Sequence, residues 1–273
     1  MIFSASMKTT DFPLCSYLER IGLRRAPNPD EEGLRTVHSA QAFSVPFENI
    51  DIHLGRPVSL KLSDLATKII ERRRGGYCFE LNGILHAALN AMRFDVRPHM
   101  ARVLYGRTTP GERTHEVLII NVSGQKWLGD AGFGGPGLRL PIPIVTGCLN
   151  EQYGEFYRLR RDKELGLVLQ KKSSSFFLDL YAFNERELTL EADIEMGNYF
   201  TSTAPGSIFR LHRMCALAHT WGRVTLSDME LTIHKNGQSK TRTLSPGPEY
   251  LAALSSHFGI HVDAKYEDFM SLE

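Results

Sequence analysis

The cysteine at position 78 stands in a local sequence that could make its thiol reactive. Residues 74–82 read Arg-Gly-Gly-Tyr-Cys-Phe-Glu-Leu-Asn, and the apolar spacing after Cys78 predicts an amphipathic helix that begins there. The free N–H groups and the positive dipole end of a helix N-terminus favour a thiolate. Arg72, Arg73 and Arg74 would act in the same direction. Because the thiolate is the nucleophilic form of cysteine, the pattern indicates covalent catalysis.

A nucleophilic cysteine needs a base, and the base needs a group that orients it. Among ten histidines, His115 is the best placed, since it lies on a predicted strand, residues 114–122, that alternates and then becomes apolar. A Ser-Gly turn leads to a second strand that ends at Asp130. This hairpin would place His115 and Asp130 roughly opposite each other, where an aspartate can hold the histidine tautomer. The sequence therefore indicates a triad of Cys78, His115 and Asp130.

Each member of this triad also has a structural interpretation. A lone cysteine that starts an amphipathic helix is usually buried filler. A histidine on an apolar strand is often a hydrogen-bonded structural residue, and Gly-Asp-Ala-Gly at residues 129–132 also reads as a turn. Spacing alone leaves the catalytic and the structural interpretations open.

Composition narrows the class of protein. The chain has 273 residues, of which 42% are apolar and 23% are charged, as in ordinary globular proteins. A net charge of +1 gives no reason to expect nucleic acid or a membrane as a partner. Residues 1–12 lack the pattern of a secretory signal, and no apolar run is long enough to span a bilayer. The four cysteines form no Cys-x-x-Cys pair, which favours reduced thiols, no metal site and a cytoplasmic location.

The periodicity of the chain changes near Phe94. Before it, four helices are predicted, and the last of them carries Cys78. After it, short strands follow one another without helices between them, which favours an antiparallel sheet or barrel and an α+β class. These strands are expected at residues 96–103, 114–122, 125–128, 157–160, 166–171 and 176–183.

The last third of the sequence is mixed. A helix is expected at residues 187–200 and a strand at 208–218. A meander is expected at 220–226, 230–235 and 240–244, with Asn236-Gly237 as a hairpin turn. A closing helix is predicted at 248–258, because proline stands in its first turn and Gly259 just beyond its end.

The chain resembles the arylamine N-acetyltransferases of bacterial type. The most specific match is the Arg-Gly-Gly-Tyr-Cys-Phe-Glu-Leu-Asn motif at residues 74–82. The resemblance extends in order over nearly the whole chain. Further matches are Tyr-Leu-Glu-Arg-Ile-Gly-Leu at 17–23, Ser-Val-Pro-Phe-Glu-Asn-Ile-Asp at 44–51, Thr-His at 114–115, Asp-Ala-Gly-Phe-Gly at 130–134 and, more weakly, residues 198–205 with Ser207 and Phe209.

This resemblance implies a fold and an activity. The fold would be an N-terminal helical domain (residues 1–93), a central antiparallel β-barrel (94–200) and a C-terminal α/β lid (201–273), with a core like that of cysteine proteases. Cys78 would take an acetyl group from acetyl-coenzyme A and pass it, in ping-pong order, to an arylamine, an arylhydrazine or an N-hydroxyarylamine. His115 would be the base and Asp130 the orienting acid. Acetyl-coenzyme A is then a substrate, and no tightly bound cofactor is implied.

The binding residues are less clearly indicated than the triad. A flat, apolar acceptor suits an aromatic pocket, for which Phe133 and Phe200 are candidates; Phe47 is a third, although it could equally pack beneath the triad. For coenzyme A, the loop with Gly132 and Gly134 could offer N–H groups to phosphates, or its glycines could simply serve the turn. Thr203 and Ser207 are candidates by family position. Arg72 and Arg73 are better interpreted as solvated surface charges.

Other functions stay open at this point. Some relatives use the same triad as amide synthases that close macrolactams. A hydrolytic cysteine enzyme is disfavoured by the context of Cys78, and a catalytically inactive binding protein is disfavoured because all three triad residues are present. The physiological acceptor, the preferred acyl group (acetyl, propionyl or malonyl) and the oligomeric state, including a homo-oligomer, are not determined by the sequence.

Overall fold

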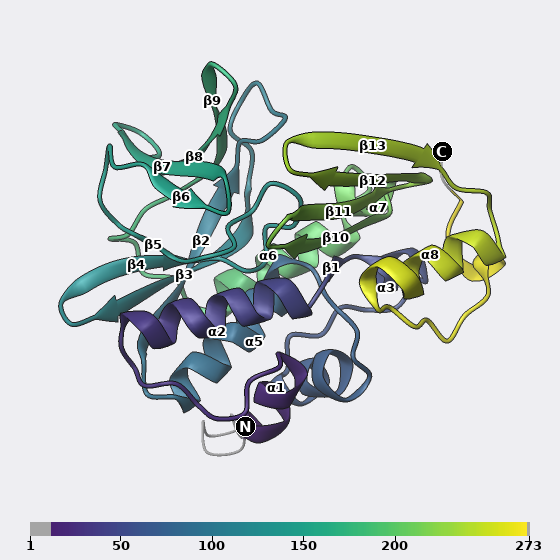
Figure 1. Ribbon diagram of the computed structural model, residues 1–273, viewed down its shortest axis with the longest axis horizontal. Coiled ribbons are helices and arrows are strands. Elements are labelled where there is room, and N and C mark those ends of the chain that lie inside the picture. Colours follow the sequence, from purple (N-terminus) through teal and green to yellow (C-terminus); the bar gives the residue numbers. More distant parts are fainter. Residues whose placement is uncertain (1–11, 272–273) are drawn as a thin grey trace.

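A group of N-terminal helices and two antiparallel sheets make up the fold (Figure 1). The computed structural model describes residues 12–271. The arrangement confirms the predicted α+β class. The helices of the first third are α1 (Leu14–Arg20), α2 (Glu31–Ser44), α3 (Ile50–His53), α4 (Leu62–Leu65), which continues as a π-helical segment (Ala66–Glu71), and α5 (Cys78–Ala91).

Helix α5 is the central element of the helical part. It begins at Cys78, as predicted, and packs against α1, α4 and the strands β2 and β3. Its larger apolar residues from Leu81 to Leu89 are fully buried, so the helix is held by contacts on several sides. The buried stem keeps the N-terminal turn at a fixed place in the molecule.

An eight-stranded antiparallel sheet forms a nearly closed barrel beside α5. Its strand order is β5-β4-β3-β2-β9-β8-β7-β6. The strands are β2 (Asp95–Val103), β3 (Arg113–Val122), β4 (Gln125–Gly129), β5 (Ile142–Pro143), β6 (Asn150–Gln152), β7 (Glu155–Asp162), β8 (Gly166–Ser173) and β9 (Phe176–Phe183). Between β3 and β4, Ser123 and Gly124 have φ angles of 51° and 82°, which gives the predicted two-residue hairpin turn.

A five-stranded antiparallel sheet occupies the other end of the molecule. Its order is β1-β10-β11-β12-β13, so a strand from the first third pairs with strands from the last third. The elements are β1 (Phe47–Glu48), β10 (Met214–His219), β11 (Gly222–Ser227), β12 (Glu230–Lys235), β13 (Gln238–Thr243) and the covering helix α8 (Pro248–Phe258). The predicted turn at Asn236-Gly237 and the predicted end of α8 at Gly259, which has a φ of 66°, are confirmed.

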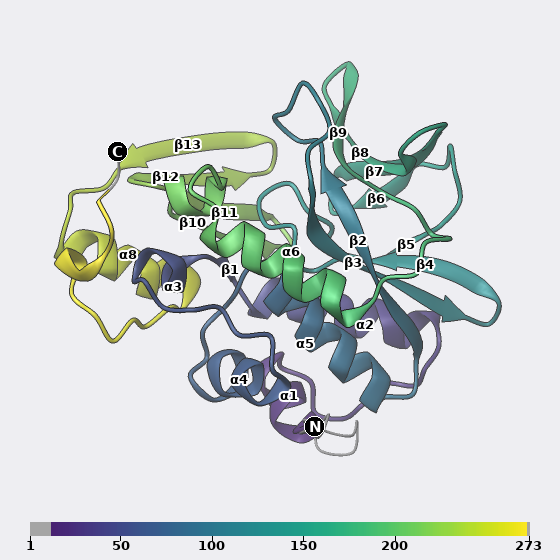
Figure 2. The ribbon, with the colours of Figure 1, turned by 180° about the vertical axis from the view of Figure 1, so that it is seen from behind.

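Two elements between the sheets differ from the sequence expectation. Helix α6 (Glu191–Thr203) begins later than predicted, where the carboxylate of Asp193 accepts the Leu190 N–H. It contacts β3 and α7 on the face seen in Figure 2. The single strand predicted at 208–218 is wrong: α7 (Ile208–Leu211) comes first, and β10 begins only at Met214. The hydroxyl of Ser207 accepts the Phe209 N–H, and this cap starts a helical turn within an apolar stretch that also fits a strand.

The segment that leads into α5 is pinned to β1 by close backbone contact. Gly76 forms a parallel bridge to Phe47, and the Glu48 N–H donates to the Gly76 carbonyl over 2.9 Å. A Cβ on Gly75 would lie 1.9 Å from the carbonyl oxygen of Pro46, so only glycine fits there. The two glycines therefore let the chain before Cys78 lie directly against β1.

Two predictions from the sequence are not tested by this fold: the division into three domains and the absence of a secretory signal. Contacts such as β1 with β10 cross the predicted limits at residues 93 and 200, and the division into three domains stays a prediction. The segment examined for a secretory signal lies, except for Phe12, outside the described residues. Within residues 12–271, no helix combines the length and the apolarity needed to cross a membrane.

The tight approach of Gly75 to Pro46 predicts opposite effects for two glycine-to-alanine changes. Gly75→Ala should lower the free energy of unfolding by about 1–3 kcal/mol or more, because the new methyl group meets backbone. Gly83→Ala, within α5, should raise it by up to about 1 kcal/mol, because its Cβ meets only the end of Leu65 at 3.4 Å. Urea unfolding measures both values, and equal effects would contradict the assigned contact.

Candidate active site

Cys78 is the first residue of α5, and its side chain is buried against β3. The thiol lies 3.7 Å from the carbonyl oxygen of Thr114, the residue before His115. The turn is fixed by Glu80, whose carboxylate accepts the Tyr77 N–H over 3.1 Å and pairs with Lys68 over 2.7 Å. The N-terminal turn thus presents the thiol to the strand that carries the histidine.

His115 and Asp130 are joined by a hydrogen bond at the end of the β3–β4 hairpin. The distance from His115 Nε2 to Asp130 Oδ2 is 2.9 Å. The register pairs Leu118 with Gly129, which sets Asp130 opposite Val117 and diagonal to His115 on the same face. The side chains of His115 and Asp130 are close, as predicted, but they lie diagonally across the hairpin and not directly opposite each other. With Nε2 engaged, Nδ1 is the ring nitrogen left for proton transfer.

The carboxylate of Asp130 is fully buried, and both oxygens accept hydrogen bonds. Oδ1 accepts from the Asn82 side-chain amide and from the Gly132 N–H, each over 2.9 Å. Burial by itself would raise the pKa of Asp130, but the charge of His115 and these hydrogen bonds hold it below its usual range. Asp130 is therefore an anion in the folded protein.

A second histidine supports the backbone of Asp130. Burial lowers the pKa of His38 to about 4, so its ring is neutral. Nε2 of His38 accepts the Asp130 N–H over 3.0 Å, and Nδ1 faces the Arg139 carbonyl at 3.3 Å. This tautomer fixes α2 to the loop that follows β4.

Two aromatic rings enclose the imidazole of His115. The ring centroids of Phe133 and Tyr181 lie 5.1 Å and 4.9 Å from the centroid of His115. The same two rings contact each other at 5.1 Å. Ring packing and the bond to Asp130 together determine the orientation of the base.

The electrostatics of Cys78 differ from the sequence expectation. Burial raises the pKa of the thiol well above its usual value, and the charge of Asp130 adds to this effect. Hydrogen bonds from the backbone N–H groups of Glu116 and Phe79 act in the opposite direction but are smaller. Burial of the thiol thus opposes the shift toward thiolate that is expected at a helix N-terminus.

The arginines before Cys78 do not favour ionisation of its thiol, contrary to the expectation from the sequence. Arg74 is buried and donates to both carboxylate oxygens of Glu48, over 2.8 Å and 2.9 Å, and it also pairs with Asp51. Its charge is thus compensated locally. Arg72 and Arg73 are exposed, in agreement with their interpretation as solvated charges.

A cavity of about 1160 Å³ opens at the thiol. Cys78, His115, Gly132, Phe133 and Phe47 line it. Further walls come from α7 and from strands β8, β10, β11 and β12, so the cavity lies between the two sheets. A small molecule that enters it can reach the thiol and the base together.

Comparison with known proteins places this site in a family. The model of the N-acetyltransferase family matches residues 30–267. An arylamine N-acetyltransferase / N-hydroxyarylamine O-acetyltransferase of Salmonella typhimurium is 31% identical, over 95% of this chain and 93% of the relative. An arylamine N-acetyltransferase of Mycolicibacterium smegmatis is 35% identical, over 90% of this chain and 91% of the relative.

The chain belongs to the arylamine N-acetyltransferase family.

Solved structures of the family agree with this assignment. The Mycobacterium marinum arylamine N-acetyltransferase in complex with CoA has a TM-score of 0.85 at 34% identity, and the match covers 90% of this chain and 92% of that chain. The Salmonella typhimurium enzyme has a TM-score of 0.87 at 30% identity, with 92% of each chain covered. The predicted family and fold are confirmed, and the chain is an enzyme of the acyltransferase class.

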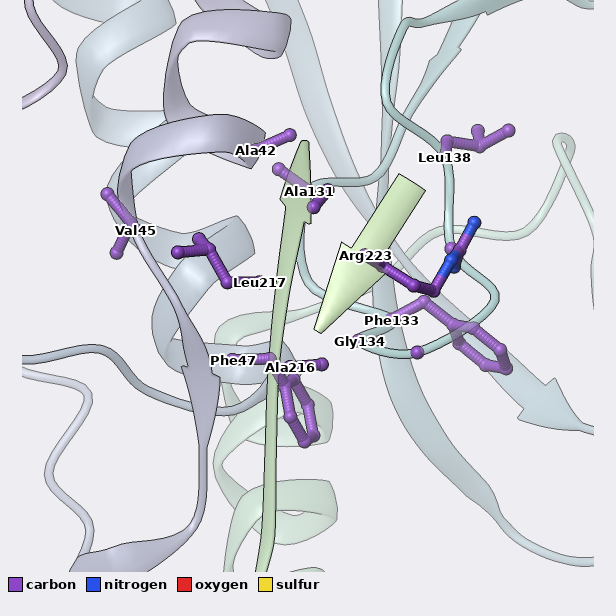
Figure 3. A pocket seen from close by; sticks show the side chains of 13 residues that line it. Ala42, Val45, Phe47, Ala131, Phe133, Gly134, Leu138, Ala216, Leu217 and Arg223 are labelled. Carbon is purple, nitrogen blue, oxygen red and sulfur yellow. The ribbon is translucent and has the colours of Figure 1, made fainter. Parts of the chain in front are cut away.

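Gly132 and Gly134, in the loop that follows Asp130, each occupy a position where a side chain would meet neighbouring atoms. A Cβ on Gly132 would lie 3.0 Å from the Cα of Cys78, and its N–H already donates to Asp130. Gly134 has a φ of 75° and lines a small pocket next to the cavity, where a Cβ would meet the Phe47 ring at 2.9 Å (Figure 3). Their predicted role toward coenzyme A phosphates stays a prediction.

Three other predicted binding residues are not among the residues that line the Cys78 cavity. Phe200 is 41% exposed on α6 and lines a different surface pocket with Met196. The hydroxyl of Thr203 is exposed and donates to the Tyr199 carbonyl. Ser207 caps α7, and its neighbours on that helix line the cavity in its place.

Four residues that surround Asp130 were not predicted from the sequence. They are Asn82, His38, Tyr181 and Glu116. Only Asn82 carried a usable signal, because it stands four residues after Cys78 and thus on the same helix face. The others come from α2, β9 and the buried face of β3, whose distances from Asp130 depend on tertiary packing.

Glu116 predicts an unusual pH dependence of stability. Burial, with a smaller effect of Asp130, raises its pKa from 4.5 to about 8. Between these values the unfolded chain has lost the proton that the folded protein keeps, so stability falls as pH rises. Glu116→Gln should remove this loss and raise the free energy of unfolding at pH 8, relative to pH 4.5, by about 3–5 kcal/mol.

Chemical denaturation at several pH values between 4.5 and 8 measures this effect. Glu112→Gln is the matched control, because Glu112 is exposed and lies just before β3. Parallel pH curves for the wild type and Glu116→Gln would show that Glu116 is ionised in the folded protein, contrary to expectation.

Proposed function

We propose that the protein transfers an acetyl group from acetyl-coenzyme A to an arylamine, an arylhydrazine or an N-hydroxyarylamine through a thioester on Cys78. The observation that carries this proposal is the position of the Cys78 thiol beside the hydrogen-bonded His115–Asp130 pair at one cavity. Membership of the family supports the choice of donor and acceptor. The cytoplasmic location expected from the sequence is part of the same proposal.

The first half-reaction loads the cysteine. The thiol proton passes to Nδ1 of His115 as the thiolate attacks the acetyl carbonyl of the donor. Because burial disfavours a lone thiolate, charge separation is favourable only as a thiolate–imidazolium pair, which the anion of Asp130 stabilises. The bond from carbonyl carbon to coenzyme A sulfur then breaks, and the leaving thiolate takes the proton from His115.

Backbone N–H groups are the candidates for holding the oxyanion of this step. The N–H groups of the first turn of α5 have no partner within the helix. Among them, the N–H of Cys78 belongs to the residue whose sulfur attacks the carbonyl carbon. A hydrogen bond to developing negative charge in a closed cavity is worth more than the same bond in water.

The second half-reaction delivers the acetyl group. Coenzyme A leaves, and the amine nitrogen attacks the thioester of Cys78. His115 takes a proton from the attacking nitrogen and returns it to the Cys78 sulfur as the carbon–sulfur bond breaks. Phe133 and Phe47 line the cavity and offer apolar faces to a flat aromatic acceptor. Phe200 is less suited to this role, since it lines another pocket.

A thioester on Cys78 predicts a change in intact mass. Incubation with acetyl-coenzyme A alone should add one acetyl group, about 42 Da, to the wild type and nothing to Cys78→Ala. An arylamine or a hydrazine should then remove the label. Cys215→Ala is the matched control, since Cys215 is also buried and lines the same cavity. An unlabelled wild-type protein, or a label that persists in Cys78→Ala, would sink the proposal.

Replacement of Asp130 should slow the acetylation of Cys78 strongly and leave the acceptor pocket intact. Asp130→Asn should slow acetylation of Cys78 by about 10²–10⁴-fold, because the amide favours the wrong tautomer of His115 and stabilises no imidazolium. Stopped-flow measurement of coenzyme A release gives this rate. Thermal unfolding of the variant serves as the control for folding. A rate within about threefold of the wild type would exclude His115 as a base oriented by Asp130.

A further inference from the structure

A buried group of charges lines the same cavity as Cys78. Glu155, at the start of β7, contacts three cations, which we call the Glu155 cluster. Arg139, from the loop after β4, lies 2.7 Å from its carboxylate, Lys171 of β8 lies at 2.7 Å, and Arg223 of β11 is also in contact. All four residues line the cavity. The cluster joins the eight-stranded sheet to the five-stranded sheet.

The charges of the Glu155 cluster do not balance. The side chains of Arg139, Arg223 and Lys171 are only 2%, 7% and 15% exposed. Glu155 is the only carboxylate among the described residues that line the cavity. Three nearly buried cations therefore share one anion. His234 faces them from β12, but burial, together with the charges of Arg223 and Lys171, lowers its pKa, so it adds no further charge at neutral pH.

Arg139 has donors that the protein leaves without a partner. Its Nε and Nη1 atoms are buried and make no hydrogen bond within the described structure. Burial and the charge of Arg223 also lower the pKa of Lys171, to about 8. Buried charges are normally paired, and an unpaired charge or donor carries a substantial free-energy cost. The Glu155 cluster thus carries an excess of positive charge at the wall of the cavity.

We infer that the Glu155 cluster is a subsite for an anionic oxygen group of a substrate. Guanidinium and ammonium groups are the side-chain groups that bind carboxylates and phosphates, and Arg139, Arg223 and Lys171 all line the cavity. Two sources share this chemistry: a carboxylate on the aromatic acceptor, and a phosphate of the acyl donor. The inference rests on the proposed transferase function, because it assigns the ligand to one of the substrates of that reaction.

Ping-pong kinetics separates the two sources. The value of kcat/KM for each substrate reports only its own half-reaction. For the acceptor, 4-aminobenzoate is compared with its methyl ester; for the donor, acetyl-coenzyme A is compared with S-acetylpantetheine, which has no phosphate. The variants are Arg139→Gln and Lys171→Gln, each of which leaves Glu155 paired with two cations. Arg161→Gln is the control, because Arg161 is 56% exposed and pairs with Glu185.

The two variants should lower kcat/KM by about 10–100-fold for the anionic member of one pair and less than twofold for its neutral member. A selective loss with 4-aminobenzoate assigns a carboxylate-bearing acceptor, and a selective loss with acetyl-coenzyme A assigns a donor phosphate. An equal loss for both members of each pair, or no loss, overturns the subsite.

A binding measurement keeps this inference separate from the proposed activity. Calorimetry on Cys78→Ala compares 4-aminobenzoate with its methyl ester, and coenzyme A with pantetheine. One anionic ligand should bind at least tenfold more tightly than its neutral partner, and Arg139→Gln in the same background should abolish the difference. If the wild type transfers no acetyl group but this preference is present, the activity fails and the anion subsite stands. Equal binding within each pair overturns the subsite.

Discussion

The buried carboxylate of Asp130 is the constraint on which the site depends. An ionised group without solvent must find its hydrogen bonds within the protein, or it becomes protonated. Asp130 finds them on three separate elements, through His115 of β3, Asn82 of α5 and the N–H of Gly132 in its own loop. The bonds that keep Asp130 ionised are therefore the same bonds that position the base and hold the nucleophile's helix against the sheet.

The thiol illustrates how two known effects compete at one atom. A helix N-terminus favours a thiolate, but burial of the Cys78 thiol acts in the opposite direction and raises its pKa. Transfer of the thiol proton to His115 would place a compensating positive charge beside the thiolate. Gly132 explains part of the burial, because its lack of a side chain lets the loop approach the Cα of Cys78. The enclosed thiol is protected from solvent, and its reaction is coupled to the histidine.

Local signals allowed much of this fold to be predicted from the sequence, and the failures were non-local. The start of α5, the Ser123-Gly124 turn and the end of α8 depend on a few neighbouring residues, and these predictions are confirmed. The charge of Arg74 could not be assigned, because its partner Glu48 lies 26 positions earlier in the chain. The short stretch before β10, residues 208–213, has apolar residues that fit a helix and a strand equally well, so local sequence could not decide. The Glu155 cluster was invisible for the same reason, since its members come from four separate segments.

The nucleophile's segment also joins the two halves of the cavity. Glu48 of β1 binds Arg74 by its side chain and Gly76 by its backbone, while β1 itself pairs with β10. The strand that holds the turn before Cys78 is thus the edge strand of the five-stranded sheet. On the opposite wall, the contact of Arg223 with Glu155 ties that sheet to the barrel. Because both connections involve buried charges, a shift of the five-stranded sheet would disturb the thiol and the charged wall together. The position of the nucleophile and the charged wall of the cavity are therefore both tied to the five-stranded sheet, the first through β1 and the second through Arg223.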